Sequence, residues 1–274
     1  MRLVTTAVCF LFLVHITIRA DASAPRRKLH DQQDNRAEAE RLWELAIAAK
    51  GGRERLYGIE NLQYSVRRRD WWGLQRVSTV IEALHVFPEK SWVWSDQRPT
   101  IFGLVIQLQN YEDGIHLGYV DRGKGSSVDP IYDMGRGGLS DFFDTQLNYF
   151  METKWVKPIP VSVESGKING RAVDIVNTVV RDYPKGKERV DEKVSFALDR
   201  KSHLPLKVIY YIVALGEVHS GGPSLSDYAE VNGIQMPLKF DGNRTTYQFN
   251  VEYEPRVFQQ PPSEQAGIDA WKKK

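Results

Sequence analysis

The chain has 274 residues, of which 42% are hydrophobic and 26% are charged. These fractions exclude wholesale disorder and a protein with many membrane spans. Lys and Arg number 37 against 35 Asp and Glu, so the net charge is only +2, and we expect no nucleic-acid partner. The single cysteine, Cys9, cannot form an internal disulfide.

Residues 1–22 have the layout of a secretory signal peptide. A basic residue precedes an apolar run over residues 3–18, and small residues follow it. We expect cleavage after Ala22, because cleavage after Ala24 would place Pro25 next to the cut bond. A retained membrane anchor is the alternative, although the apolar run is short for a span. The pattern therefore predicts a periplasmic or otherwise exported protein, and the mature chain would lack cysteine.

The rest of the chain is predicted to form one domain over residues 35–262, with a flexible polar lead-in at 23–34 and a tail at 263–274. A helix is expected to begin near Asn35 and to end at the Gly51-Gly52 pair. Its apolar positions recur at steps of three and four, which is typical of a helix with one buried face. They are Ala39, Leu42, Trp43, Ala46 and Ile47.

From Leu62 onward the hydrophobic pattern changes to a period of two, in short segments that predict about eleven strands. Tight-turn sequences between them favour an antiparallel sheet that curls or closes, and the fold class is mainly β with α. The predicted turns are Glu112-Asp113-Gly114, Ser165-Gly166-Lys167, Asn169-Gly170, Asn232-Gly233 and Asp241-Gly242.

Residues 138–155 interrupt the series of strands with a helical pattern. One stripe of this helix is apolar, so we expect it to cover one face of the sheet. The stripe contains Leu139, Phe142, Phe143, Leu147, Phe150 and Met151.

Motifs for catalysis are missing from the sequence: it has no HExxH, no GxSxG and no CxxC. The histidines beyond residue 22 are scattered, without the spacing of metal ligands on one helix. We therefore predict no catalytic residue, no metal site and no cofactor. A zinc site assembled from distant strands, and a hydrolase site around His116 and His203, are the alternatives.

Tryptophans beside arginines form the most unusual local pattern. We expect this segment at a hairpin tip, where indole rings next to cations suit a membrane interface or an amphiphilic partner. For any single aromatic residue, a place in the core is the alternative. The predicted membrane or partner contacts are Arg67, Arg68, Arg69, Trp71 and Trp72.

Three stretches together resemble the LolA/LolB superfamily of periplasmic lipoprotein carriers, including its outer-membrane lipoprotein-sorting-like proteins. The first is AAKGGRERLYGIENLQY, in which a glycine pair, a short turn and a strand follow the entry helix. The second is the hairpin VSFALDRKSHLPLKVIYY. The third is DYAEVNGIQMPLKF, followed by YQFNVEYEPRVFQQPP. Together the three stretches place the resemblance at about residues 35–262.

The resemblance implies a curved antiparallel half-barrel with the N-terminal helix and an inserted lid helix on its concave face. It also implies a monomeric, non-enzymatic carrier of a lipid or an acylated lipoprotein. A regulatory or scaffolding module that binds an envelope membrane protein is the alternative. The predicted cavity and lid residues are Trp92, Trp94, Val105, Phe142, Phe143, Leu147, Phe150 and Tyr211.

Overall fold

The computed structural model describes most of the chain beyond residue 23. The described residues are 24–72, 75–98, 103–110, 115–121, 126–130, 145–153, 156–185, 188–214 and 217–259. The predicted signal peptide and the predicted C-terminal tail lie outside them. In this part of the chain, no helix is long and apolar enough to cross a membrane.

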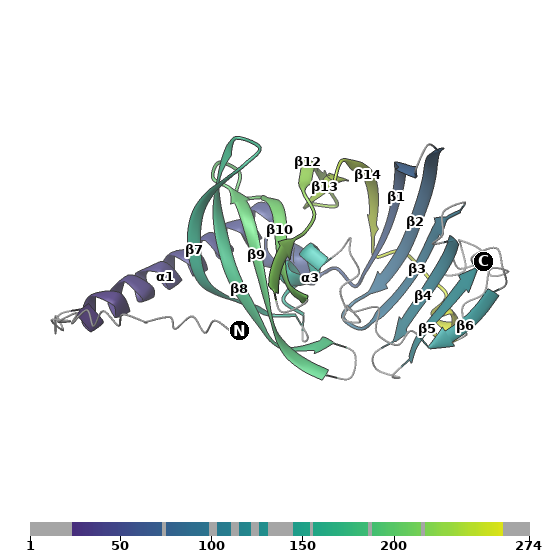
Figure 1. Cartoon of the computed structure of the whole chain (residues 1–274), viewed down its shortest axis with the longest axis horizontal. Helices are drawn as coiled ribbons and strands as arrows, with labels where there is room; N and C mark the ends of the chain where they lie inside the picture. Colours follow the sequence, from purple (N-terminus) through teal and green to yellow (C-terminus); the bar gives the residue numbers. More distant parts are fainter. Residues whose placement is uncertain are drawn as a thin grey trace, which may run out of the picture.

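Antiparallel strands dominate the structure, as the sequence predicts (Figure 1). A nine-stranded sheet has the order β12-β13-β14-β1-β2-β3-β4-β5-β6. Its strands are β1 (Asn61–Trp72), β2 (Gln75–Val86), β3 (Lys90–Gln97), β4 (Gly103–Asn110), β5 (Ile115–Asp121), β6 (Ser126–Pro130), β12 (Leu225–Val231), β13 (Ile234–Phe240) and β14 (Asn243–Phe249).

A five-stranded sheet has the order β11-β10-β9-β8-β7. An isolated antiparallel bridge between Lys207 and Ser224 links it to the larger sheet. Together the sheets form the expected open half-barrel. The strands of the smaller sheet are β7 (Pro158–Ile168), β8 (Arg171–Lys185), β9 (Glu188–Asp199), β10 (Pro205–Ala214) and β11 (Glu217–Gly221).

The structure has fourteen described strands, compared with the eleven or so expected. The two that the hydrophobic pattern does not indicate, β6 and β11, are five residues long and lack a run of alternating apolar residues. Asn169-Gly170, Asn232-Gly233 and Asp241-Gly242 form the predicted tight turns, each with two positive φ angles. The turn expected at Ser165-Gly166-Lys167 is wrong, because these residues belong to β7.

The last strand pairs with the first. Leu62 of β1 lies opposite Phe249 of β14, and β2 borders the other side of β1. The backbone N–H of Asn250 donates to the carbonyl of Asn61, 3.0 Å away. The two ends of the domain therefore meet in the middle of the larger sheet.

Three helices pack on the inner face of the half-barrel, which is the face that bears most of the core. They are α1 (Ala24–Lys50), α2 (Arg53–Tyr57) and α3 (Thr145–Met151). The apolar stripe predicted for α1 is confirmed, since all five of its side chains are buried. The helix begins at Ala24 and so includes residues 24–34, which the sequence indicates as a lead-in. Pro25 fits there, because a first helical turn tolerates proline.

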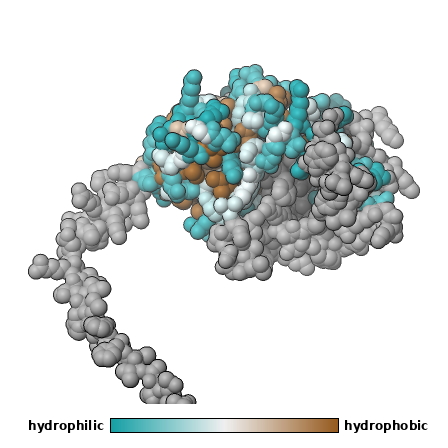
Figure 2. All heavy atoms as spheres, turned by 45° about the horizontal axis from the view of Figure 1, so that its top comes forward, coloured by the Kyte–Doolittle hydropathy of each residue, from teal (hydrophilic) through white to brown (hydrophobic). Residues whose placement is uncertain are grey.

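The outer face of β2–β5 bears a second core. Its tryptophan and aliphatic side chains are covered by Val251, Tyr253 and the 3-10 helix η1 (Pro255–Phe258), whose Phe258 is buried. On the outer face of the five-stranded sheet, Ile159, Val161 and Tyr211 remain exposed. Figure 2 shows hydrophobic side chains at the surface among hydrophilic ones on this half of the molecule.

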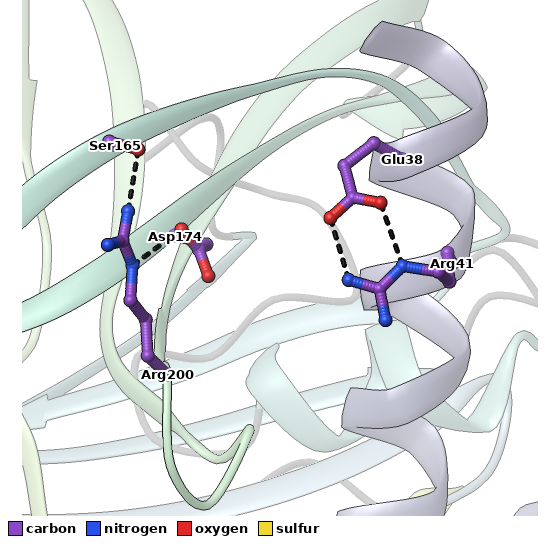
Figure 3. A network of polar contacts seen from close by, with 5 residues as sticks. All are labelled: Glu38, Arg41, Ser165, Asp174 and Arg200. Atoms are coloured by element: carbon purple, nitrogen blue, oxygen red, sulfur yellow. Dashed lines mark hydrogen bonds and ion pairs between the residues drawn. The ribbon is translucent and has the colours of Figure 1, made fainter. Parts of the chain in front are cut away.

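Exposed ion pairs decorate α1 and the neighbouring strands (Figure 3). Arg41 pairs with Glu38 on α1, and Arg200 donates to Asp174 (2.9 Å) and to Ser165 (2.6 Å). Exposed pairs of this kind contribute little to stability. The apolar stripe of α1 therefore holds the helix on the sheet.

Asn35 of α1 binds the free edge of β7. Its Oδ1 accepts from the backbone N–H of Val163 at 2.6 Å, and its Nδ2 donates to the carbonyl of Val163 at 3.3 Å. β7 is the last strand of its sheet, so the backbone groups on this edge have no neighbouring strand. The carboxamide satisfies two of them and blocks strand pairing at this point.

We expect Asn35→Ala to lower the free energy of unfolding by about 1–2 kcal/mol, because both partners are partly buried and both bonds are lost. Urea denaturation measures the change. Asn243→Ala is the matched control, since that amide bonds only the carbonyl of Asp241 within an exposed turn. Equal effects of the two substitutions would contradict the role assigned to Asn35.

Candidate functional site

The candidate site is the inner face of the half-barrel where α1 and α3 meet the sheets. Trp43 of α1 stacks on Phe150 of α3, with ring centroids 4.7 Å apart and planes 13° apart. Phe196 of β9 packs against both rings, at 5.0 and 5.5 Å. These three rings fill the space between α1, α3 and β9.

Helix α3 covers the inner face, as expected for the inserted helix, and lies between the two sheets in Figure 1. The prediction placed this helix over residues 138–155, and the described helix covers 145–151. Phe142 and Phe143 lie outside the described residues. The apolar side chains of α3 all contribute to the core, and they are Leu147, Tyr149, Phe150 and Met151.

A polar latch holds the C-terminal end of α3. Glu152 accepts hydrogen bonds from Arg53 (2.6 Å) and from the hydroxyl of Tyr57 (2.7 Å), and Arg53 also pairs with Glu44 of α1. The bond to Glu152 raises the pKa of Tyr57. Glu152 has a positive φ of 48°, which is uncommon for this residue type. Hydrogen bonds and ion pairs therefore fix the end of α3 to α1 and α2, in addition to the apolar packing of the helix.

Several polar atoms buried where α3 packs against α1 and the sheets lack a hydrogen-bond partner among the described residues. They are Nε1 of Trp43, both amide atoms of Gln146 and the hydroxyl of Tyr149. Burial raises the pKa of Tyr149 well above its ordinary value. Each unpaired buried group costs about 1–3 kcal/mol. The interface between α3 and α1 is therefore well packed, but several of its buried polar groups make no hydrogen bond within the described part of the chain.

A small pocket lies where α3 meets the turn between β2 and β3. His85, Glu89, Ser91 and Asn148 contribute polar side chains to its lining, together with apolar residues of the turn. The pocket has room for one water-sized molecule. His85 stacks on Tyr64 at 5.5 Å, and burial lowers the pKa of His85 to about 3. This imidazole is therefore neutral at physiological pH.

Lys50, the last residue of α1, is fully buried and lies against the core residues Phe150 and Met236 on the inner face. Its Nζ donates to the carbonyl of Gln235 and lies 3.8 Å from Sδ of Met236. The aromatic rings of Phe150 and Tyr228 lie 5.9 and 5.5 Å from it. Burial lowers the pKa of Lys50 to about 7. Lys50 was not among the predicted site residues, because a lysine at the end of a helix is usually exposed.

The predicted lining residues of β3 and β4 lie on opposite faces of the sheet. Trp92 and Trp94 are buried in the second core, under η1 on the outer face. Val105 lies opposite Ser95 in the register, so it is on the inner face, where it is half-buried. The prediction that these three side chains line one cavity is wrong, because alternation along the strand separates them.

Tyr211 also points outward and is 41% exposed. Its hydroxyl lies 3.0 Å from Oγ of Ser195, which donates to Asn177 at 2.6 Å. Asn177 in turn donates to Ser162 and Glu164. Tyr211 therefore belongs to a polar network on the outer face and not to the concave side.

The segment rich in arginine and tryptophan forms a hairpin, with Trp72 paired to Gln75 across β1 and β2. Arg67 is exposed and Arg68 is half-buried. The side chains of Arg69, Trp71 and Trp72 lie outside the described ones, so the contact role proposed for this tip stays a prediction.

The histidines of the alternative hydrolase site belong to different parts of the fold. His116 is in β5, and His203 is in the turn between β9 and β10. Within the described residues, no three His, Cys, Asp or Glu side chains are grouped as metal ligands would be. The geometry gives no support to a site built from this pair.

No protein-family model and no curated protein matches the sequence. Solved structures similar to this chain include a DUF1329 family protein from Desulfovibrio piger, with 12% identity, coverage of 80% of this chain and 96% of that chain, and a TM-score of 0.46. A putative outer membrane lipoprotein-sorting protein domain from Vibrio parahaemolyticus has 15% identity, coverage of 80% and 97%, and a TM-score of 0.43. A LolA superfamily protein from Nitrosomonas europaea has 13% identity, coverage of 78% and 91%, and a TM-score of 0.45.

Lys50→Met is expected to stabilise the protein on the order of 2 kcal/mol at pH 7, since burial of an amine that has no ion-pair partner among the described residues is costly. In the wild type, the unfolded chain holds a proton on Lys50 between about pH 7 and 10.5 that the folded chain lacks. Stability from this group therefore rises with pH over that window and is constant below it.

The measurement is the free energy of unfolding of both proteins from pH 6 to pH 10. The advantage of Lys50→Met should shrink as the pH rises toward 10. A wild type that is the more stable protein at pH 7, or a difference that does not change with pH, would contradict this account.

Proposed function

We propose that this protein is an exported binding protein that takes up a lipid or the acyl chains of a lipidated protein on the inner face of its half-barrel. Helix α3 acts as a removable cover of that face. Catalysis has no part in this function. The resemblance of three sequence stretches to the LolA/LolB superfamily supports the same class of cargo.

The observation that carries the proposal is the way in which α3 packs against the inner face. This seven-residue helix packs four side chains of the core onto the inner face, while polar atoms of Trp43 in α1 and of its own Gln146 and Tyr149 have no hydrogen-bond partner among the described residues. A hydrocarbon chain can replace these apolar side chains, because burial of the chain contributes about 0.8 kcal/mol per CH₂ and so offsets the cost of exposing the apolar side chains of α3. Moving α3 also releases its unpaired polar groups to new partners. Exchange of α3 for an acyl chain is therefore physically reasonable.

The predicted site residues divide accordingly. Leu147 and Phe150 belong to the cover, and Val105 lies on the inner face opposite Ser95 of β3. Trp43 and Phe196 would become part of the lining once Phe150 moves away. Trp92, Trp94 and Tyr211 have no part in the proposed site.

The protein purified from its own envelope should contain lipid that mass spectrometry detects in an organic extract. It should also bind a fluorescent fatty acid saturably, and unlabelled fatty acid should compete. The absence of both extracted lipid and saturable binding would refute the proposed function.

Glu152→Asn tests the cover itself. Asn tolerates a positive φ and is too short to hold Arg53, so α3 should open more readily. We expect the fluorescent fatty acid to associate roughly 5-fold faster, which corresponds to about 1 kcal/mol for a partly exposed latch. Asp191→Asn, which removes an exposed pair with Arg181 on β8 and β9, is the matched control. Equal rates in both variants would show that α3 does not control access.

A regulatory or scaffolding module is the second candidate. The observation that favours it is the filled space between Trp43, Phe150 and Phe196, which leaves no room for a ligand while α3 is closed. Photo-crosslinking in the envelope from the exposed position of Tyr211, with Lys201 on the β9–β10 turn as a control position, tests it. A defined membrane protein captured only from Tyr211, together with lipid-free protein, would support this candidate.

A further inference from the structure

Lys50 is a cation placed inside the apolar core without a carboxylate beside it. Among the described residues it makes no ion pair, and its side chain is fully buried. The contacts of Nζ are the carbonyl of Gln235, the sulfur of Met236 and two aromatic faces. An ammonium group has three donors, and only the one on Gln235 meets an oxygen. A second donor meets the sulfur of Met236, which is a weak acceptor, so within the described part of the chain one donor is left for a further acceptor.

The backbone around Lys50 fixes this position. Gly51 has a φ of 130°, and a Cβ at this residue would lie 2.5 Å from the carbonyl oxygen of Gly233. Only glycine allows the end of α1 to approach the β12–β13 turn so closely. Lys50 therefore reaches the inner face from a rigid helix end. A binding group held in this way loses little side-chain freedom when a ligand arrives.

Phe150 connects Lys50 to the cover. Its ring lies over Nζ and at the same time stacks on Trp43. Phe150 belongs to α3, so removal of the cover would take away one of the two rings that shield the amine. Tyr228 on β12 is the titratable group that faces Lys50, and burial raises its pKa, so it stays neutral. β13 contributes only Gln235 and Met236.

We propose that Lys50 binds the anionic headgroup of an amphiphile whose hydrocarbon chain takes the place of α3 on the inner face. The ligand class is a lipid with a carboxylate or a phosphate group, and this inference rests on the proposed function. A charge-assisted hydrogen bond from Lys50 to such a group is stronger in a site that excludes water. Uncharged lipids of the same chain length bind the same face more weakly.

Binding of three fluorescent probes with one chain length tests the proposal. They are a fatty acid, the corresponding alcohol and a lysophosphatidic acid, titrated into the full exported chain at pH 6.5. We expect the wild type to bind at least one of the two anionic probes about 10-fold more tightly than the alcohol. Preference for the fatty acid or for the phosphate distinguishes the two sources of negative charge.

Lys50→Met should bind the alcohol as the wild type does and lose the preference for the anionic probe. The control Lys239→Met removes an exposed lysine of β13, paired with Asp227, and should keep the preference. Thermal melting shows that each variant is folded. In the wild type the preference should also fall as the pH rises from 6 to 9, because burial lowers the pKa of Lys50 to about 7.

The outcomes separate this inference from the proposed function. If no probe binds saturably, the proposed function itself fails. If the wild type binds all three probes equally, or if Lys50→Met keeps the preference for an anionic probe, lipid binding stands and the role of Lys50 is refuted.

Discussion

The contact between Trp43, Phe150 and Phe196 is the interaction on which the rest of the interior depends. It joins α1, α3 and strand β9 of the smaller sheet, and these three elements are far apart in the sequence. These three side chains are among the largest that are fully buried in the described part of the chain. Once they are in contact, the remaining apolar residues of α1 and α3 can pack only against the inner faces of the two sheets.

The hydrophobic pattern of the sequence predicts much of this fold. The stripe on α1, the period of two along the strands and the turns at Asn169-Gly170, Asn232-Gly233 and Asp241-Gly242 depend on neighbours in the sequence, and the structure confirms them. The turn predicted at Glu112-Asp113-Gly114 lies outside the described residues. The short strands β6 and β11 were not predicted, because pairing with a neighbouring strand, and not an apolar pattern of their own, makes them strands. The turn predicted around Gly166 was wrong, because a glycine inside a strand gives the same local signal as a turn.

The candidate site was predicted less well, for a physical reason. Alternation says that Trp92 and Trp94 share a face, but it does not say which face is the inner one. That choice depends on η1, which covers the outer side with Phe258 from the far end of the chain. Lys50 was missed because α3 and β13, which are distant in the sequence, bury it. The hydrophobic pattern around residue 50 does not indicate such contacts. Leu147 and Phe150, by contrast, could be found from their own helix.

The pairing of β1 with β14 has a consequence for how the chain folds. Asn61 and Asn250, which are in contact, are 189 positions apart. Contacts between such distant positions form slowly, because a long loop must close first. The centre of the larger sheet cannot be completed until almost the whole domain is free to pair. This strand pairing therefore forms only after the chain has been made as far as β14.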